Sequence, residues 1–186
     1  MPLNANELRK GTTFYFNNEL YRVIEYQHHK PGRGNAIIRT KLRNLRTGTI
    51  IPHNFLSGER FEEAPVERRP MQFLYEDRGF YYFMDTESYN QVRISQELVE
   101  EKIGYLIEGQ EYTVSVLENE PLDVELPPAV ELEVVESELA VAGDTATGAT
   151  KRVICETGLK VQVPLFVEVG DVIRVDTSSG EYVTRV

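Results

Sequence analysis

The chain has 186 residues, which allows one large domain or two to three small ones at roughly 100–200 residues per typical domain. Its 41% of hydrophobic and 10% of aromatic residues supply enough apolar material for a packed core, so a wholly disordered chain is excluded. The apolar runs are too short to span a bilayer, and no secretory signal pattern is present, so no membrane segment is expected. The single cysteine, Cys155, cannot form an internal disulfide, and a reducing cytoplasm is the expected compartment.

Charge is distributed unevenly along the chain. The formal balance is +4 for residues 1–65, −9 for residues 66–127 and −5 for residues 128–186, within a net charge of −10. Because nucleic-acid affinity rests on neutralising phosphates, an acidic chain is not an ordinary nucleic-acid binder. A basic block on an acidic chain can instead give one end of the molecule a surface that faces a polyanion. Chance unevenness is the alternative interpretation.

Turn signals recur about every 8–12 residues, a spacing typical of β-sandwiches and small barrels. The runs between them are rich in β-branched and aromatic residues, which suit a half-buried pleated surface. In chain order, strands are predicted over 13–16, 20–26, 37–45, 49–52, 71–75, 80–84, 112–117 and 122–126. The turns between paired runs are Asn17-Asn18, Thr47-Gly48, Asp77-Arg78-Gly79 and Asn119 with Pro121, and Gly158, Gly170-Asp171 and Ser178-Ser179-Gly180 punctuate the last third.

One short helix is predicted near the middle of the chain. Ser95 can cap it, Glu97 lies in its first turn, and the helix ends near Gly109. Its apolar positions are Leu98, Ile103 and Leu106. Residues 4–9 are expected to add one further turn.

Prolines coincide with the shifts in charge. Pro65–Pro70 lies where the balance changes from basic to acidic, and Pro127-Pro128 separates the second block from the third. Proline-rich segments favour extended connectors. The sequence therefore predicts an all-β protein of three small domains, over residues 1–65, 66–127 and 128–186, each of about sixty residues and just able to fold alone.

Motifs for catalysis or metal binding do not emerge from the sequence. His28 and His29 are adjacent on a predicted strand and point to opposite faces, and no Cys/His spacing matches a zinc site. No P-loop, Rossmann or G-x-S-x-G pattern occurs. Cys155 lies in a predicted strand and is interpreted as a small buried hydrophobe. We expect no metal, no cofactor and no enzymatic activity of its own.

The most informative segment is a tip loop, residues 30–35, which reads Lys30-Pro31-Gly32-Arg33-Gly34-Asn35 and links two long predicted strands. Gly32 and Gly34 leave Arg33 with little bulk beside it, so this arginine can enter a narrow site. Arg39, Lys41 and Arg43 share one face of the following strand, since alternate strand residues point the same way. Such a cationic strip suits a phosphate backbone. The alternative is a polar hairpin with a solvated face.

A second polar segment runs from Gly143 through Asp144 and Thr145 to Lys151. Its backbone N–H groups and hydroxyls can contact a base or a phosphate. A surface loop without a ligand is the alternative interpretation.

Together these segments resemble the bacterial elongation factor P family. The motifs are the hairpin Lys30-Pro31-Gly32-Arg33-Gly34, the Gly143-Asp144-Thr145 loop, and a tail with Gly158-Leu-Lys-Val-Gln-Val-Pro-Leu-Phe-Val, Gly170-Asp171 and Gly180-Glu-Tyr182. The resemblance covers essentially the whole chain. It implies an N-terminal SH3-like (KOW) barrel followed by two OB-fold barrels, in an L-shaped, tRNA-like arrangement. A distant relative, initiation factor 5A, lacks the third domain.

The resemblance also implies a function and a set of partners. Members bind the 70S ribosome between the P and E tRNA sites and relieve stalling at consecutive prolines by promoting peptide-bond formation. By resemblance, Arg33 reaches toward the peptidyl-transferase centre, and Lys30, Pro31, Gly32 and Gly34 shape its loop. The same comparison places P-site peptidyl-tRNA and ribosomal RNA against Arg39, Lys41, Arg43, Tyr182 and Arg185. The E-site codon of the mRNA is implied for Gly143, Asp144 and Thr145. A cytoplasmic monomer is expected.

Departures from the family pattern leave alternatives open. Many members carry a modified lysine at the tip, whereas Arg33 is followed by Gly34 rather than Asn, so it is either rhamnosylated by a modifying enzyme or unmodified. A factor-P-like paralogue also has a tip arginine, although the Gly143-Asp144-Thr145 sequence favours factor P itself. A general single-stranded RNA-binding OB protein would show exposed aromatic platforms. A protein-interaction adaptor would instead show an apolar patch.

Overall fold

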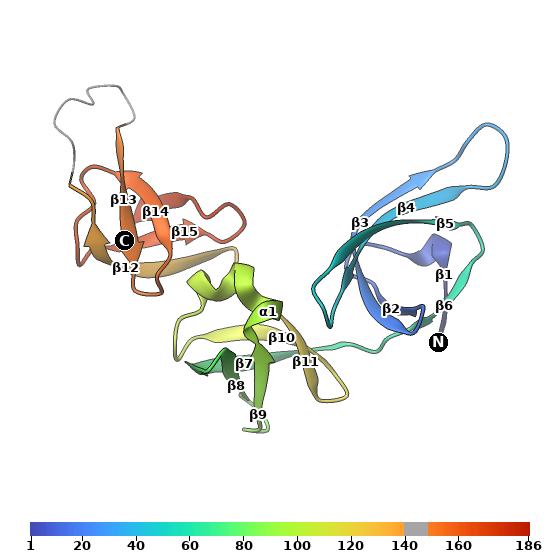
Figure 1. Ribbon diagram of the computed structural model, residues 1–186, viewed down its shortest axis with the longest axis horizontal. Coiled ribbons are helices and arrows are strands. Elements are labelled where there is room, and N and C mark those ends of the chain that lie inside the picture. The colour runs from blue at the N-terminus through green and yellow to red at the C-terminus, as the bar shows by residue number, and fades with distance from the viewer. Residues whose placement is uncertain (140–148) are drawn as a thin grey trace.

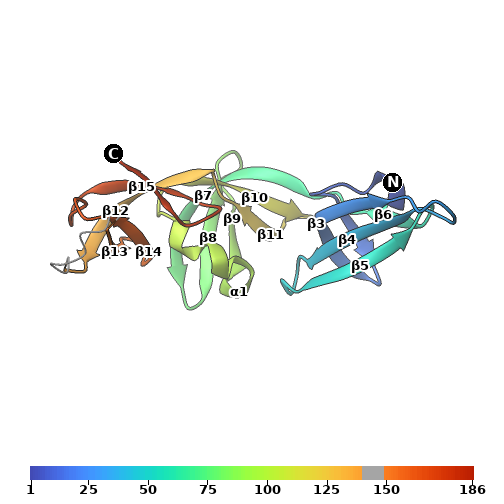
Figure 2. The ribbon, with the colours of Figure 1, turned by 90° about the horizontal axis from the view of Figure 1, so that it is seen from above.

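The computed structural model describes residues 1–139 and 149–186, and these residues form three antiparallel sheets, one for each third of the chain. Each sheet curls into a small barrel (Figure 1). In that view the N-terminal and C-terminal barrels rise from the same side of the middle barrel. Seen from above, the three barrels follow one another along the molecule (Figure 2). The fold is therefore all-β, and the row of barrels is bent, as the family resemblance implies.

The N-terminal sheet has six strands in the order β1-β6-β2-β3-β4-β5. They are β1 (Pro2–Asn4), β2 (Thr13–Phe16), β3 (Glu19–His29), β4 (Ile37–Asn44), β5 (Ile50–Leu56) and β6 (Arg60–Glu63). The expected first turn is the 3-10 helix η1 (Ala5–Glu7), where the Glu7 carboxylate accepts the Asn4 N–H at 2.7 Å. Buried Phe14, Val23 and Phe55 lie in the core of this barrel.

The middle sheet has five strands in the order β11-β10-β7-β8-β9. They are β7 (Glu67–Asp77), β8 (Phe80–Asp85), β9 (Gln91–Ser95), β10 (Glu111–Leu117) and β11 (Glu120–Glu125). A helical connection, α1 (Gln96–Val99) and η2 (Glu100–Tyr105), joins β9 to β10.

The C-terminal sheet has the order β14-β13-β12-β15-β16. Its strands are β12 (Ala129–Ser137), β13 (Thr150–Cys155), β14 (Lys160–Pro164), β15 (Val172–Asp176) and β16 (Tyr182–Arg185). In this sheet and in the middle one, the first strand is central, the second and third lie on one side, and the fourth and fifth lie on the other. This shared connectivity is that of a five-stranded OB barrel.

The predicted turns are confirmed by backbone geometry. Asn17, Asn18, Arg78 and Asn119 all have positive φ, the conformation that tight turns between antiparallel strands require. These signals were readable because a turn is specified by residues adjacent in the chain.

Two local predictions differ from the structure. The expected helix is one α-turn followed by a 3-10 helix that ends at Tyr105, and the Ser95 side chain makes no capping hydrogen bond. The segment from Glu67 to Pro70 is predicted as a connector but is the start of β7, paired with β10. Pro70 is tolerated there because β8 pairs with β7 only from Met71 onward. Pro127-Pro128 does lie between β11 and β12, as predicted.

Candidate functional site

The tip loop is carried by the longest hairpin of the N-terminal barrel. β3 and β4 pair from Tyr21 opposite Asn44 to His29 opposite Ile37. The last residues of β3, from Gln27 to His29, are exposed, so this end of the hairpin lies outside the packed core. In Figure 1 the loop that follows β3 extends away from the other two barrels. The hairpin thus displays its connecting loop at one end of the molecule.

The base of this loop is tied to the barrel, while its centre is surrounded by open space. The Ser57 N–H donates to the Ala36 carbonyl at 2.9 Å, and Asn6 donates to the Ser57 hydroxyl at 3.0 Å. Gly34 has φ +103°, a conformation that other residues avoid. A Cβ at Gly32 or Gly34 would meet no atom within 4 Å. Arg33 is exposed and makes no hydrogen bond or ion pair with any described residue.

The cationic face predicted for β4 is present. Arg39 and Lys41 are exposed and Arg43 is half-buried, whereas the alternating residues Ile38, Thr40 and Leu42 are buried. Thr40 is satisfied because its hydroxyl donates to the His53 carbonyl at 2.7 Å. Arg39, Lys41 and Arg43, called the cationic face below, therefore lie on one side of the strand, as the alternation predicts.

Neighbouring strands moderate the charge of the cationic face. Lys41 Nζ lies 3.0 Å from a Glu25 carboxylate oxygen, and both side chains are more than half exposed. Exposed pairs of this kind are worth little and are easily exchanged for another anion. Arg39 lies between Gln27 and Asn54 in register and has no ion-pair partner among the described residues. The face can therefore present hydrogen-bond donors and positive charge to phosphates.

The other predicted contact residues lie in the C-terminal barrel. Tyr182 and Arg185 are both on β16, as expected. Tyr182 is half-buried and packs against the core of this barrel, whereas the Arg185 guanidinium lies 3.6 Å from Asp171 and 5.0 Å from the centre of the Phe166 ring. Gly143, Asp144 and Thr145 lie outside the described residues. The structure brings the tip loop and the cationic face together in one barrel and places β16 in another.

The remaining reactive groups have structural surroundings. Cys155 is buried, and desolvation, with a smaller contribution from Glu156, raises the pKa of its thiol to about 11. Since the thiolate is the reactive form, Cys155 is a packing residue, as predicted. His28 and His29 are exposed near the tip loop. Within residues 1–139 and 149–186, there is no group of three metal-ligating side chains and no helix long and apolar enough to cross a membrane.

Comparison with known families accounts for all three barrels. Residues 4–61 match the elongation factor P KOW-like domain, residues 66–124 match the elongation factor P OB domain, and residues 130–185 match the elongation factor P C-terminal domain. The chain belongs to the elongation factor P family. Its relatives include elongation factor P of Moorella thermoacetica, 48% identical over 183 residues that span 98% of this chain and 99% of that protein. Elongation factor P of a Thermoanaerobacter species is 49% identical over 182 residues, which are 98% of each chain.

These relationships make the protein a translation elongation factor that associates with the ribosome. Among solved structures, a eukaryotic translation initiation factor 5A from Methanococcus jannaschii aligns with a TM-score of 0.54 at 18% identity, over 67% of this chain and 94% of that one. This likeness shows a fold shared over 67% of the chain, which is the length of about two of its three barrels. The KOW and OB assignments expected from the resemblance are confirmed.

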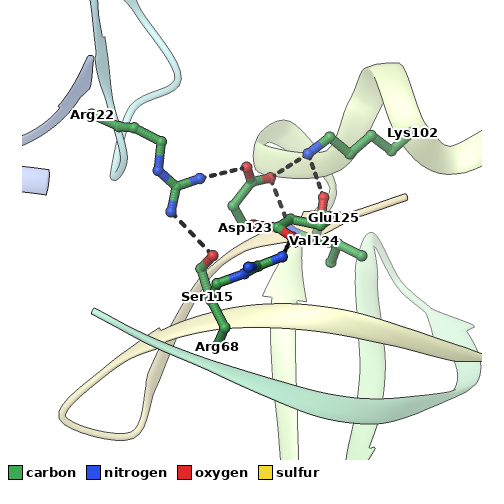
Figure 3. Close-up of polar contacts among 7 residues, drawn as sticks. All are labelled: Arg22, Arg68, Lys102, Ser115, Asp123, Val124 and Glu125. Carbon is green, nitrogen blue, oxygen red and sulfur yellow. Dashed lines mark hydrogen bonds and ion pairs between the residues drawn. The ribbon is translucent and has the colours of Figure 1, made fainter. Parts of the chain in front are cut away.

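Sequence reasoning missed one constellation in this elongation factor P family member. Arg22 of the N-terminal barrel contacts Ser115 and Asp123 of the middle barrel, and Asp123 also contacts Lys102 (Figure 3). Arg22 and Asp123 are 101 residues apart, and each taken alone is an ordinary charged residue in an ordinary strand. We call these four residues the polar joint. No local pattern in the sequence signals it.

Proposed function

We propose that this factor binds the ribosome between the P and E tRNA sites and stimulates peptide-bond formation at consecutive prolines. The observation that carries the proposal is the exposed Arg33, held at the end of the β3–β4 hairpin with no competing partner among the described residues. An exposed arginine without a partner among the described residues can enter a confined, anionic RNA site without first breaking an ion pair.

The proposed chemistry belongs to the ribosome, and the factor contributes orientation. Proline is a poor nucleophile and a rigid acceptor, so an unproductive placement of the peptidyl-tRNA slows the reaction. Holding two reactants in a productive geometry can remove a large part of a barrier, because the entropy of alignment is supplied by binding. The tip loop would act on the tRNA end and the nascent chain in this way.

Other residues would hold the tRNA in register. The cationic face supplies donors to the phosphates of P-site peptidyl-tRNA, and phosphate contacts fix position rather than sequence. Arg185 and Tyr182 would lie on the RNA side of the C-terminal barrel. The loop with Gly143, Asp144 and Thr145, outside the described residues, would approach the E-site codon of the mRNA.

The state of Arg33 is part of the proposal. A guanidinium at an exposed loop is accessible to a modifying enzyme, and the family resemblance names rhamnosylation as the modification of tip arginines. The factor would act either rhamnosylated or with an unmodified arginine, and both forms keep the side chain at the same position in the loop.

Reconstituted translation of a Pro-Pro-Pro reporter tests the proposal. The factor made without modifying enzymes is compared with Arg33→Ala, and a proline-free reporter serves as the control. We expect the factor to rescue the proline reporter alone and Arg33→Ala to lose the rescue. If the unmodified factor binds ribosomes without rescue, Arg33 requires its modification. Absence of both rescue and ribosome binding would contradict the proposal.

A second candidate function rests on one observation. Tyr75 and Tyr82, on neighbouring strands of the middle OB barrel, are stacked with ring centres 4.7 Å apart, and Tyr75 is 44% exposed. Exposed aromatic rings on OB sheets bind single-stranded RNA by base stacking. Salt-sensitive binding to free RNA, lost in Tyr75→Ala, would favour this alternative. The formal charge of −9 over residues 66–127 opposes it.

A further inference from the structure

We propose that Asp123 is a positioning residue, which fixes the N-terminal barrel, and hence the tip loop, relative to the rest of the molecule. The inference rests on the proposed function, because it concerns where Arg33 is delivered. Asp123 lies on β11, far from the tip loop in sequence.

Two cations from different barrels, Arg22 and Lys102, hold the Asp123 carboxylate (Figure 3). Its Oδ2 lies 3.3 Å from Arg22 Nη1, and its Oδ1 lies 2.7 Å from Lys102 Nζ. The Val124 N–H also donates to Oδ1, at 2.9 Å. The side chains are largely buried, with exposed fractions of 16%, 20% and 10% for Arg22, Lys102 and Asp123. Charge-assisted hydrogen bonds in such a site are strong and directional.

The position of Arg22 on β3 couples the polar joint to the tip loop. It lies on β3, the strand that ends at the tip loop, and it is paired in register with Arg43 of the cationic face. Its second nitrogen, Nη2, donates to the buried Ser115 hydroxyl at 3.1 Å, so the guanidinium is fixed at two points. A change of angle at Arg22 would therefore be amplified along the hairpin.

Lys102 connects the same carboxylate to the C-terminal barrel. Three residues further along η2, Tyr105 is buried in the core of that barrel. Between them, the Gly104 carbonyl accepts the Thr157 hydroxyl at 2.6 Å. Asp123 thus joins the strand that leads to the tip loop to the helix that is anchored in the last barrel.

Apolar packing around the polar joint cannot fix the angle by itself. Leu20, Leu45 and Ala64 of the N-terminal barrel pack with Leu117 and Leu122 of the middle one, and we call these five residues the leucine cluster. Hydrophobic contact is non-directional, and this small cluster is separate from the cores of both barrels. The fork of hydrogen bonds at Asp123 selects one orientation, and its loss would leave Arg22 and Lys102 as two neighbouring cations without their shared anion.

The test compares Asp123→Ala and Asp123→Asn with Arg46→Ala. Arg46 and Glu120 form the other ion pair between these barrels, at 3.7 Å, and both side chains are half exposed. Since exposed ion pairs contribute little, Arg46→Ala is the matched control. Spin labels on Glu62→Cys and Glu87→Cys, both exposed, report the distance between the barrels. The buried thiol of Cys155 stays unlabelled.

We expect the Asp123 variants to broaden the distance distribution and Arg46→Ala to leave it unchanged. In the proline reporter assay, the Asp123 variants should lower the maximal rate at saturating factor by about tenfold, since a misplacement of about 1 Å can cost up to about a hundredfold. A merely destabilised factor would recover the full rate when more is added. Arg22→Lys keeps the charge that faces Asp123, so its maximal rate should lie between those of the parent factor and the Asp123 variants.

Unchanged distances, or a maximal rate that recovers in excess factor, would overturn the inference. Asp123→Asn keeps the size and polarity of the side chain, so it decides the matter if Asp123→Ala does not fold. Arg33→Ala, with its polar joint intact, separates the two claims. A full rate in Arg33→Ala contradicts the proposed function, whereas the distances still decide the role of Asp123.

Discussion

The two joints between the barrels are held by different forces. Between the N-terminal and middle barrels, the polar joint lies beside the leucine cluster. Between the middle and C-terminal barrels, Tyr105 of η2 is buried in the core of the neighbouring barrel, and a Cβ on Gly104 would lie only 2.8 Å from a Leu159 methyl. The first joint specifies an orientation through charge, whereas the second inserts the Tyr105 ring into the core of the C-terminal barrel. We call this second contact, made by Gly104 and Tyr105, the apolar joint.

This difference fits what each barrel has to do. The inserted Tyr105 ring makes the middle and C-terminal barrels one support, because a side chain inside a close-packed core does not slide. The N-terminal barrel carries the tip loop and is aligned on that support by a small number of directional bonds. Errors at the polar joint should therefore affect activity, whereas errors at the apolar joint should affect stability first.

Tyr105→Ala should have the largest effect on stability. Removal of this buried ring leaves a cavity in the C-terminal core and should lower the free energy of unfolding by about 3–5 kcal/mol. Urea unfolding, followed by hydrogen exchange of β12 and β15, measures it. Tyr105→Phe keeps the ring and should stay close to the parent protein. An equal loss in both variants would show that the hydroxyl, and not the packed ring, holds the joint.

Leu122→Ala is the corresponding change in the leucine cluster. Leu122 is only 2% exposed, and its truncation should cost about 2–3 kcal/mol, with the exchange protection lost first at the N-terminal joint. Leu139→Ala, at a leucine that is 92% exposed, is the matched control and should change stability very little. If both variants behave alike, the cluster contributes nothing to the joint.

The barrels could be predicted from sequence, but the joints could not. Asn17-Asn18 and Asp77-Arg78-Gly79 predict their hairpins because a turn is specified by adjacent residues. The alternation in β4 likewise predicts that Arg39 and Lys41 point away from the core. Arg22 and Asp123 meet only where two barrels contact each other, so no spacing in the sequence signals them. The prediction of a connector at Pro70 is wrong because a proline excludes a strand only where neighbouring strands hydrogen-bond to both of its edges.

Alkaline pH should loosen the apolar joint. Burial, with a smaller contribution from Asp176, raises the pKa of Tyr105, and burial likewise raises the pKa of Tyr112, whose hydroxyl donates to the Tyr105 carbonyl at 2.8 Å. Both groups favour the neutral form when folded. Their contribution is complete below the ordinary tyrosine pKa of about 10 and is lost as the pH rises through the higher folded values.

Unfolding midpoints between pH 8 and 11 measure this dependence. The loss of stability above about pH 10 should be smaller in Tyr105→Phe and Tyr112→Phe than in the parent protein, since each variant removes one titrating group. An identical pH profile in all three proteins would exclude these tyrosines as its source.

Arg46→Ala should have the smallest effect. Its ion pair with Glu120 spans 3.7 Å between half-exposed side chains, and such pairs contribute less than about 1 kcal/mol and are screened by salt. Thermal unfolding at low and high ionic strength checks this. A loss of stability as large as that of Leu122→Ala would mean that the exposed Arg46–Glu120 pair, rather than Asp123, holds these two barrels together.

Cross-linking from the tip loop is the most direct test of the central claim, that the β3–β4 hairpin delivers Arg33 to the reacting end of the peptidyl-tRNA. A photoreactive residue at the exposed Asn35, two positions from Arg33, leaves the arginine in place, and the same probe at Glu62 is the control. On ribosomes stalled at consecutive prolines, we predict cross-links from position 35 to the 3′ end of P-site tRNA or to the peptidyl-transferase RNA, and none from position 62. Cross-links from position 35 only to RNA or protein distant from that centre would contradict the account.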